Sequence, residues 1–116
     1  MELAFKQSYQ FRDWVRALKD PKAKARVLAR ITAAKAGNFG HCEPVGEGVS
    51  EMRIHVGAGY RAYYTRIRDV VCYLLTDGDK SSQKADIKRA LKMASELEES
   101  LAAEAYAAAQ TKGKTQ

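Results

Sequence analysis

The segment from Ser50 to Arg66, "SEMRIHVGAGYRAYYTR", constrains the fold of this chain more than any other stretch. Its first half alternates apolar and polar side chains with a period of two, which is typical of a β-strand with one buried face. The glycines of "GAG" can adopt positive φ and therefore suit the tight turn of a hairpin. The second half, "YRAYYTR", is rich in aromatic residues and suits the returning strand. The sequence therefore predicts an antiparallel hairpin.

The two faces of this hairpin differ in charge. Alternation places the apolar residues of "EMRIHV" toward the core and leaves Glu51, Arg53 and His55 on the opposite face. In the returning strand, Arg61 and Tyr63 share one side, and the sequence leaves open whether the hairpin register joins them to Arg53 and His55. If it does, the joint face is a basic patch with an aromatic ring beside it. The alternative is an ordinary solvated sheet surface, on which arginine and tyrosine are common.

Two amphipathic helices are expected before the hairpin, after a short strand at "LAF". Apolar residues recur every three or four positions from Ser8 onward, and the Ser8 side chain can cap that helix. Asp20 and Pro21 are a typical N-cap and first-turn residue for a second helix, which Gly37 ends. The sequence therefore predicts a helical hairpin joined at a proline.

After the strand hairpin, a turn at residues 68–69 and the apolar run "VVCYLLT" predict another strand. The loop "DGDKSSQ" then leads into a long helix that continues through the alanine-rich "SLAAEAYAAAQ", followed by a frayed end. This order is typical of an α+β domain. We expect an N-terminal helical hairpin packed on one face of a twisted antiparallel sheet of about four strands, with a C-terminal helix and the other sheet face open.

The net charge of +6 and the pI near 9.4 favour an anionic partner, with nucleic acid ahead of an acidic protein or a membrane surface. Solubility alone is the alternative explanation for such a charge. The length of 116 residues suits one domain, and neither a membrane span nor a secretory signal is expected. Cys42 and Cys72 are isolated, and His41, Cys42 and His55 lack metal-ligand spacing. We therefore expect a cytoplasmic protein with no metal and no cofactor.

Arg53, Arg61, Lys80, Tyr63 and His55 together match what RNA cleavage without a metal requires. The ribose 2′-hydroxyl must lose a proton, the leaving 5′-oxygen must gain one, and the charge on the phosphate must be neutralised. Arginine suits the last task because its planar fork holds two phosphate oxygens. His55 suits proton transfer, and Tyr63 suits base stacking or hydrogen bonding. Taken singly, His55 is more typical of a surface histidine.

Four segments resemble successive signatures of the RelE/ParE toxin superfamily, most closely its HigB-type branch of addiction module killer proteins. They are "FRDWVRALKD", "RITAAKAGNFG", "EPVGEGVSEMRIHVGAGYRAYYT" and "LLTDGDKSSQKADIKRA". The resemblance implies a RelE-like fold and the role of toxin in a type II toxin–antitoxin system, in which the toxin cleaves mRNA on the ribosome. It also implies a helix-turn-helix antitoxin that neutralises the toxin and carries the complex to operator DNA.

The family's basic site carries over to Arg53 in "EMRI", Arg61 in "GYR" and Lys80 in "GDK". The chain departs from the RelE branch because it lacks that branch's lysines on the strand "EMRIHV", and because Tyr106 lies outside the matched part. A ParE-like gyrase inhibitor and a catalytically degenerate toxin that acts only in the antitoxin–operator complex are therefore alternatives. We expect the toxin domain to span residues 1–98, followed by an alanine-rich helical extension and frayed tail at 99–116.

Overall fold

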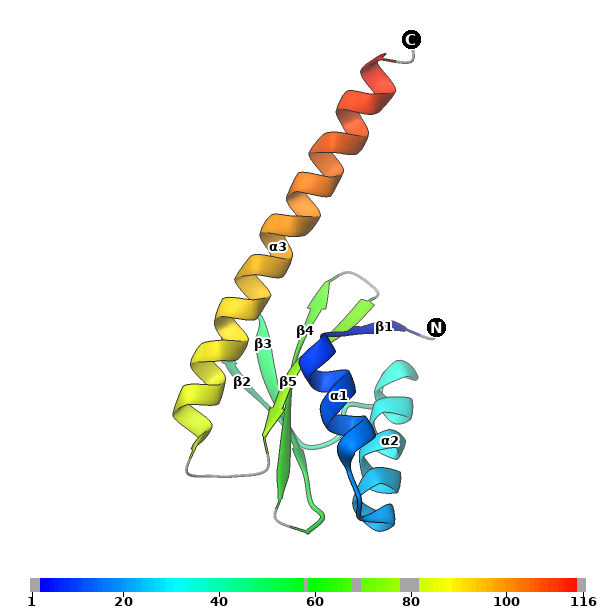
Figure 1. Ribbon diagram of the computed structural model, residues 1–116, viewed down its shortest axis with the longest axis vertical. Coiled ribbons are helices and arrows are strands. Elements are labelled where there is room, and N and C mark those ends of the chain that lie inside the picture. Colours follow the sequence, from blue (N-terminus) through cyan, green and yellow to red (C-terminus); the bar gives the residue numbers. More distant parts are fainter. Residues whose placement is uncertain (1–2, 58, 68–69, 78–81, 115–116) are drawn as a thin grey trace.

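The computed structural model describes residues 3–57, 59–67, 70–77 and 82–114, and it places one sheet between two layers of helix (Figure 1). In chain order the elements are β1 (Ala4–Gln7), α1 (Tyr9–Ala17), α2 (Pro21–Lys35), β2 (Cys42–Gly46), β3 (Val49–Ile54), β4 (Tyr60–Ile67), β5 (Val70–Asp77) and α3 (Gln83–Lys114). The strand order is β1-β5-β4-β3-β2, with β1 parallel to β5 and the other pairs antiparallel. The predicted α+β class is confirmed.

The sheet differs from the expected one in strand number and in direction. The sequence pattern predicted no strand at β2, yet β2 pairs with β3 at the sheet edge, where a register shift lies between Pro44 and Gly46. Proline lacks a backbone donor, which an edge strand tolerates. β1 pairs in parallel with a strand far along the chain, and such pairing leaves no local signal in the sequence. The sheet therefore has five strands where about four were expected, and it is mixed where an antiparallel sheet was expected.

The helix boundaries follow the predicted caps. The Ser8 hydroxyl accepts the Phe11 N–H at 3.0 Å, and the Asp20 carboxylate accepts the Lys22 N–H at 3.0 Å. α2 ends at Lys35, and Gly37, the predicted terminator, follows the C-cap Ala36 with a φ of 92°, in the left-handed region that glycine favours. These caps fix where the helical hairpin begins and ends.

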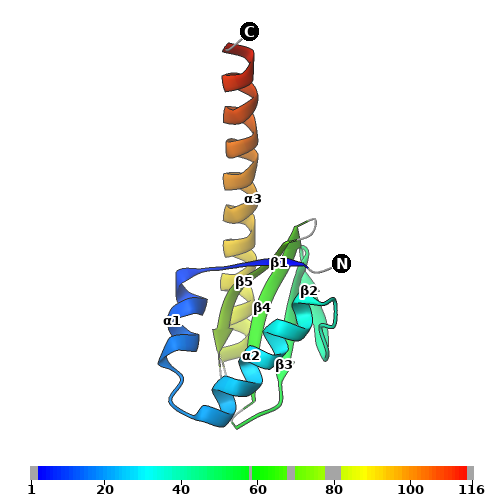
Figure 2. The same ribbon diagram turned by 90° about the vertical axis from the view of Figure 1, so that its right-hand side faces the viewer.

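The two sides of the sheet bury separate cores. In Figure 2, α1 and α2 lie in front of the sheet and α3 lies behind it. The front core contains Leu3, Phe11, Val27, Ile31, Ala34, Met52, Ile54, Ala62, Tyr64 and Val71. The rear core contains Val49, Tyr63, Ala90 and Ala94. The expectation that helices cover only one face is therefore wrong, because the first half of α3 packs on the face predicted to be open.

α3 is a helix of 32 residues, which corresponds to about 48 Å at 1.5 Å per residue. Its second half projects well beyond the sheet (Figure 1), and Ala102, Ala103 and Glu104 are exposed there. The helix runs on to Lys114, past the point where fraying was expected. The turn predicted at residues 68–69 and the loop position Lys80 lie outside the described residues. None of the described helices is both long and apolar enough to span a lipid bilayer.

Candidate functional site

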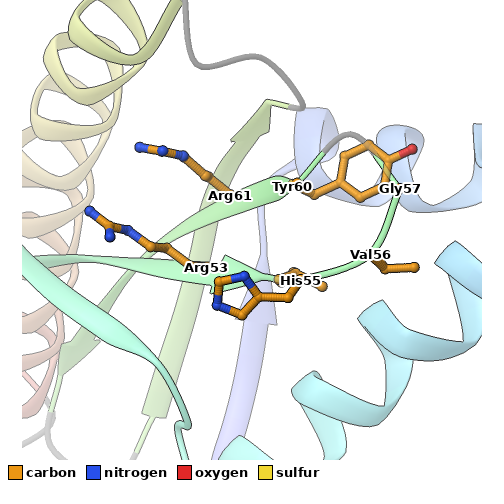
Figure 3. Close-up of a pocket in the computed structure, with 8 residues that line it drawn as sticks. Arg53, His55, Val56, Gly57, Tyr60 and Arg61 are labelled. Carbon is orange, nitrogen blue, oxygen red and sulfur yellow. The ribbon is translucent and has the colours of Figure 1, made fainter.

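The hairpin register brings Arg53, Arg61 and Tyr63 of the predicted site onto one face. Arg53 of β3 lies directly opposite Arg61 of β4, and Glu51 lies opposite Tyr63. Figure 3 shows the guanidinium groups of Arg53 and Arg61 side by side, pointing to the same side of the sheet. The condition that the sequence left open, a shared face for both arginines and Tyr63, is therefore met.

A buried carboxylate organises this face. The Glu51 side chain is 1% exposed, and its Oε1 accepts hydrogen bonds from Arg53 Nε at 3.0 Å and Arg61 Nη1 at 3.3 Å. Its Oε2 accepts from Tyr63 Oη at 3.0 Å and from Gln83 Nε2 at 2.9 Å. Each carboxylate oxygen thus receives two donors, and the donors come from β3, β4 and α3. Four donors satisfy a carboxylate that would be costly to bury alone.

These contacts keep Glu51 ionised. Burial by itself would raise the pKa of Glu51, but the hydrogen bonds from Arg53, Gln83 and Tyr63 and the charge of Arg61 outweigh it and lower the pKa below the ordinary value of 4.5. Burial raises the pKa of Tyr63 well above its usual range, and the adjacent Glu51 raises it further. At neutral pH, the site therefore contains a carboxylate anion and a neutral phenol.

Sequence reasoning assigned no role to Glu51. It did place Glu51 on the same face as Arg53, and an acidic residue there beside two arginines is the signal that indicates an ion-pair network. Burial of Glu51 could not be inferred, because it depends on where α3 lies.

Tyr63 requires a correction. It shares a face with the arginines as expected, but its side chain is fully buried in the rear core with Val49, Ala90 and Ala94. A ring buried under α3 presents no face on which a nucleobase can stack. Of the two roles predicted for Tyr63, base stacking is therefore wrong, whereas hydrogen bonding is present as the contact that Tyr63 Oη donates to Glu51.

Three of the predicted residues line one hollow at the turn end of the hairpin. Its volume is about 450 Å³, and its lining comprises Arg53, Ile54, His55, Val56, Gly57, Gly59, Tyr60 and Arg61. The Arg53 side chain is 35% exposed and that of Arg61 is 12% exposed. Arg53 and Arg61 bring two guanidinium groups to this hollow, and guanidinium groups suit an anionic ligand such as phosphate. Lys80 lies outside the described residues.

On the opposite face of the hairpin, the side chains near the turn pack against the front core. Figure 3 shows Tyr60 and Val56 pointing toward the helical hairpin, away from the two guanidinium groups. The Tyr60 ring contacts Trp14 edge-on, with ring centroids 5.3 Å apart. Packing on one side therefore fixes the strand ends that present Arg53, His55 and Arg61 on the other.

A second histidine lies beside His55. His41 Nδ1 and His55 Nε2 are 2.9 Å apart, and the two rings stack with centroids 5.1 Å apart. His41 lies before β2, and its position in the sequence predicted no role for it. Within the part of the chain that the structure describes, no group of three or more His, Cys, Asp or Glu side chains is placed to hold a metal ion.

Arg30 of α2 links the segment before β2 to the backbone of Arg53. Its Nη1 donates to the Arg53 carbonyl at 2.6 Å and its Nη2 to the Phe39 carbonyl at 2.9 Å. Gly40 makes this approach possible, since a Cβ there would lie 2.8 Å from Arg30 Nη2. The Arg30 guanidinium therefore holds the backbone of Arg53, although Arg30 is not among the residues that line the hollow.

Comparison with known proteins gives two matches. The family described as "Phage derived protein Gp49-like (DUF891)" matches residues 13–98, which is most of the chain. An uncharacterized protein of Haemophilus influenzae (strain ATCC 51907 / DSM 11121 / KW20 / Rd) is 42% identical over 97 residues, covering 84% of this chain and 98% of the relative. No solved structure gives a significant match. The extent of the family match shows that the chain belongs to the phage-derived Gp49-like family.

Proposed function

We propose that this protein is the toxin of a type II toxin–antitoxin system and that it cleaves mRNA on the ribosome without a metal. The observation that carries the proposal is the hollow in which Arg53, Arg61 and His55 meet, with Glu51 fixing both guanidinium groups. Membership in the Gp49-like family and the resemblance to HigB-type toxins support the same role. The net charge of +6 supports an anionic substrate.

In the proposed reaction, His55 transfers the proton and the two arginines stabilise the negative charge. His55 takes the proton of the ribose 2′-hydroxyl, and the resulting 2′-oxygen attacks the adjacent phosphorus. The bond from phosphorus to the 5′-oxygen breaks, and that oxygen takes a proton from water. The products are a 2′,3′-cyclic phosphate and a 5′-hydroxyl end. Arg53 and Arg61 neutralise the charge that builds on the phosphate oxygens during this step.

In this proposal, Glu51 and Tyr63 do not contact the substrate but hold the two arginine side chains in position. Glu51 Oε1 holds Nε of Arg53 and Nη1 of Arg61, which limits the rotamers of both side chains before the substrate arrives. Tyr63 and Gln83 orient the carboxylate through its other oxygen. Two guanidinium groups that are already in place need not move as charge develops on the phosphate. Such electrostatic preorganisation accounts for much of the rate enhancement of many enzymes. Tyr63 is thus a positioning residue, and Lys80 is proposed as a phosphate contact from the family resemblance alone.

The proposed partners follow from the same role. A helix-turn-helix antitoxin binds the toxin, masks its basic site and carries the complex to operator DNA. The ribosome presents the mRNA. No direct contact of this chain with DNA is proposed.

Mapping of cellular RNA ends after induced expression tests this function. Wild-type protein is expected to produce new mRNA ends at defined codon positions, and Arg61→Gln is expected to abolish them. Arg66→Gln is the matched control, because Arg66 is an exposed arginine on the same strand that lies near the Phe39 ring on the other face. Urea unfolding of all three proteins checks that the fold is retained.

Two results would contradict the proposal. Intact mRNA together with induction of the DNA-damage response indicates the ParE-like alternative, a gyrase inhibitor. Intact mRNA without growth arrest indicates the catalytically degenerate toxin.

A further inference from the structure

The distance between His41 and His55 restricts where protons can lie. At 2.9 Å, His41 Nδ1 and His55 Nε2 share one hydrogen bond, so one nitrogen carries the proton and the other accepts it. A neutral imidazole has one N–H and one bare nitrogen. The choice of donor therefore fixes both tautomers at once. If His55 Nε2 donates, then His55 Nδ1 is bare, whereas if His55 Nε2 accepts, then His55 Nδ1 carries the proton.

Glu43 biases this choice. Its Oε1 lies 3.9 Å from His41 Nε2, the ring nitrogen of His41 that does not face His55. A nearby carboxylate favours a proton on that nitrogen, and a neutral His41 protonated at Nε2 has a bare Nδ1. His41 Nδ1 then accepts, His55 Nε2 donates, and His55 Nδ1 is left with a lone pair. Within the described part of the chain, no side chain or backbone group bonds His55 Nδ1.

The backbone holds His41 in this position. The His41 carbonyl accepts the Arg53 N–H at 3.0 Å, so His41 is attached to β3 although it precedes β2 in the chain. Arg30 Nη2 approaches the same carbonyl at 3.5 Å. The pair therefore sits on a fixed backbone next to the hollow. Charged groups near the pair include Glu43 on the His41 side, Arg30 at the His41 carbonyl, and Arg53 and Arg61 in the lining of the hollow.

We propose that Glu43 and His41 are positioning residues that hold His55 in the tautomer protonated at Nε2, so that His55 Nδ1 is the base that accepts the substrate's 2′-hydroxyl proton. Glu43 acts on His41 Nε2–H through its charge, at 3.9 Å, and His41 Nδ1 accepts the hydrogen bond from His55 Nε2–H. When His55 Nδ1 takes the substrate proton, the new positive charge is stabilised through the His41 ring, which keeps its contact with Glu43. The base role rests on the proposed function, whereas the tautomer assignment does not.

Nitrogen NMR of the full chain tests the tautomers directly. The chain has two histidines, so single His41→Asn and His55→Asn variants assign every ring signal. At a pH where both rings are neutral, we expect both to be protonated at Nε2, with a nitrogen–nitrogen coupling across the hydrogen bond and slow solvent exchange of the His55 Nε2 proton. Glu43→Gln is expected to raise the population of the opposite tautomer pair, whereas Glu99→Gln on the exposed part of α3 is not. A His55 protonated at Nδ1 in the wild-type protein would overturn the assignment.

Kinetics on ribosome-bound mRNA test the base role separately. We expect His55→Ala to lower kcat about 10²- to 10⁴-fold, the usual size of a general-base contribution. His41→Asn is expected to reproduce part of that loss with little change in KM, because the arginines that bind phosphate are unaltered. A wild-type kcat for His41→Asn would overturn the positioning role of His41. If the wild-type protein cleaves no RNA while the tautomers are as expected, the proposed function fails and the tautomer assignment stands.

Discussion

Glu51 carries one negative charge between two guanidinium groups, and the geometry of the site depends on it. The carboxylate is buried, so it interacts with Arg53 and Arg61 in an environment where charge–charge interactions are stronger than in water. Its four donors come from two strands and from α3, so the same residue joins the sheet to the C-terminal helix. Stability and preorganisation of the site are therefore linked through a single side chain.

Glu51→Gln is expected to destabilise the protein by about 1.5–3 kcal/mol, the usual range for hydrogen bonds to a charged group. The amide keeps the size of the side chain but removes its charge and places an NH₂ group against donors such as Arg53 or Gln83. Urea unfolding at neutral pH measures the change. Glu99→Gln, an exposed substitution of the same chemistry, is the control and should be neutral. Equal stability of the Glu51→Gln and wild-type proteins would contradict the role of Glu51.

The stability contributed by Glu51 should depend on pH. Because the folded-state pKa of Glu51 lies below the ordinary value of 4.5, the unfolded chain takes up the proton first as the pH falls. The stabilisation by ionised Glu51 is therefore fully present above pH 4.5 and is lost as the pH falls from 4.5 through the folded-state pKa of Glu51. The difference in unfolding free energy between wild type and Glu51→Gln should become smaller over this acidic range. A difference that is constant from neutral pH down to acid would contradict the assignment.

At the scale of elements, the packing of α3 determines which parts of the rear face of the sheet are accessible. Its first half packs small residues, Ala90 and Ala94, against Val49 and Tyr63. Gln83, the first residue of α3, bonds Glu51. The helix thereby buries Tyr63, while the hollow at the turn end of the hairpin stays accessible.

Ala90→Leu is expected to destabilise the fold by about 1–3 kcal/mol, because the added side chain must displace α3 from the sheet. Ala103→Leu is the matched control, since it is the same change in the exposed second half of the same helix. Thermal or urea unfolding of both variants measures the difference. A neutral Ala90→Leu variant would show that α3 does not pack tightly on the sheet.

Local sequence signals predicted the helical hairpin and the strand hairpin well. Ser8, Asp20 and Gly37 act through neighbouring backbone groups, so their roles are visible in the sequence. The face shared by Arg53 and Arg61 followed from alternation once the register was known. Burial of Tyr63, by contrast, depends on where α3 packs. The parallel β1–β5 pair and the contact between His41 and His55 likewise join distant segments, which no local pattern encodes.

At the scale of the whole molecule, the protein is a small body from which one long helix extends (Figures 1 and 2). The principal dimensions are 57, 30 and 24 Å, and the long one follows from α3. The rear core ends near Leu97, and the family match ends at residue 98. We therefore propose that residues 1–98 fold without the extension, in line with the predicted division of the chain.

A chain that ends at Glu98 is expected to unfold cooperatively, with a free energy within about 0.5 kcal/mol of the full chain, because changes at exposed positions cost little. Urea unfolding followed by circular dichroism measures both quantities. A loss of several kcal/mol, or loss of cooperativity, would show that the extension contributes to the fold.

The chemistry of the RNA ends made by the wild-type protein tests the central claim most directly. If Arg53, Arg61 and His55 promote attack by the 2′-hydroxyl, mRNA from expressing cells should gain 5′-hydroxyl ends paired with 2′,3′-cyclic phosphates. Arg61→Gln should remove these ends while Arg66→Gln retains them. New ends that carry a 5′-phosphate, or the same 5′-hydroxyl ends from Arg61→Gln, would contradict the account.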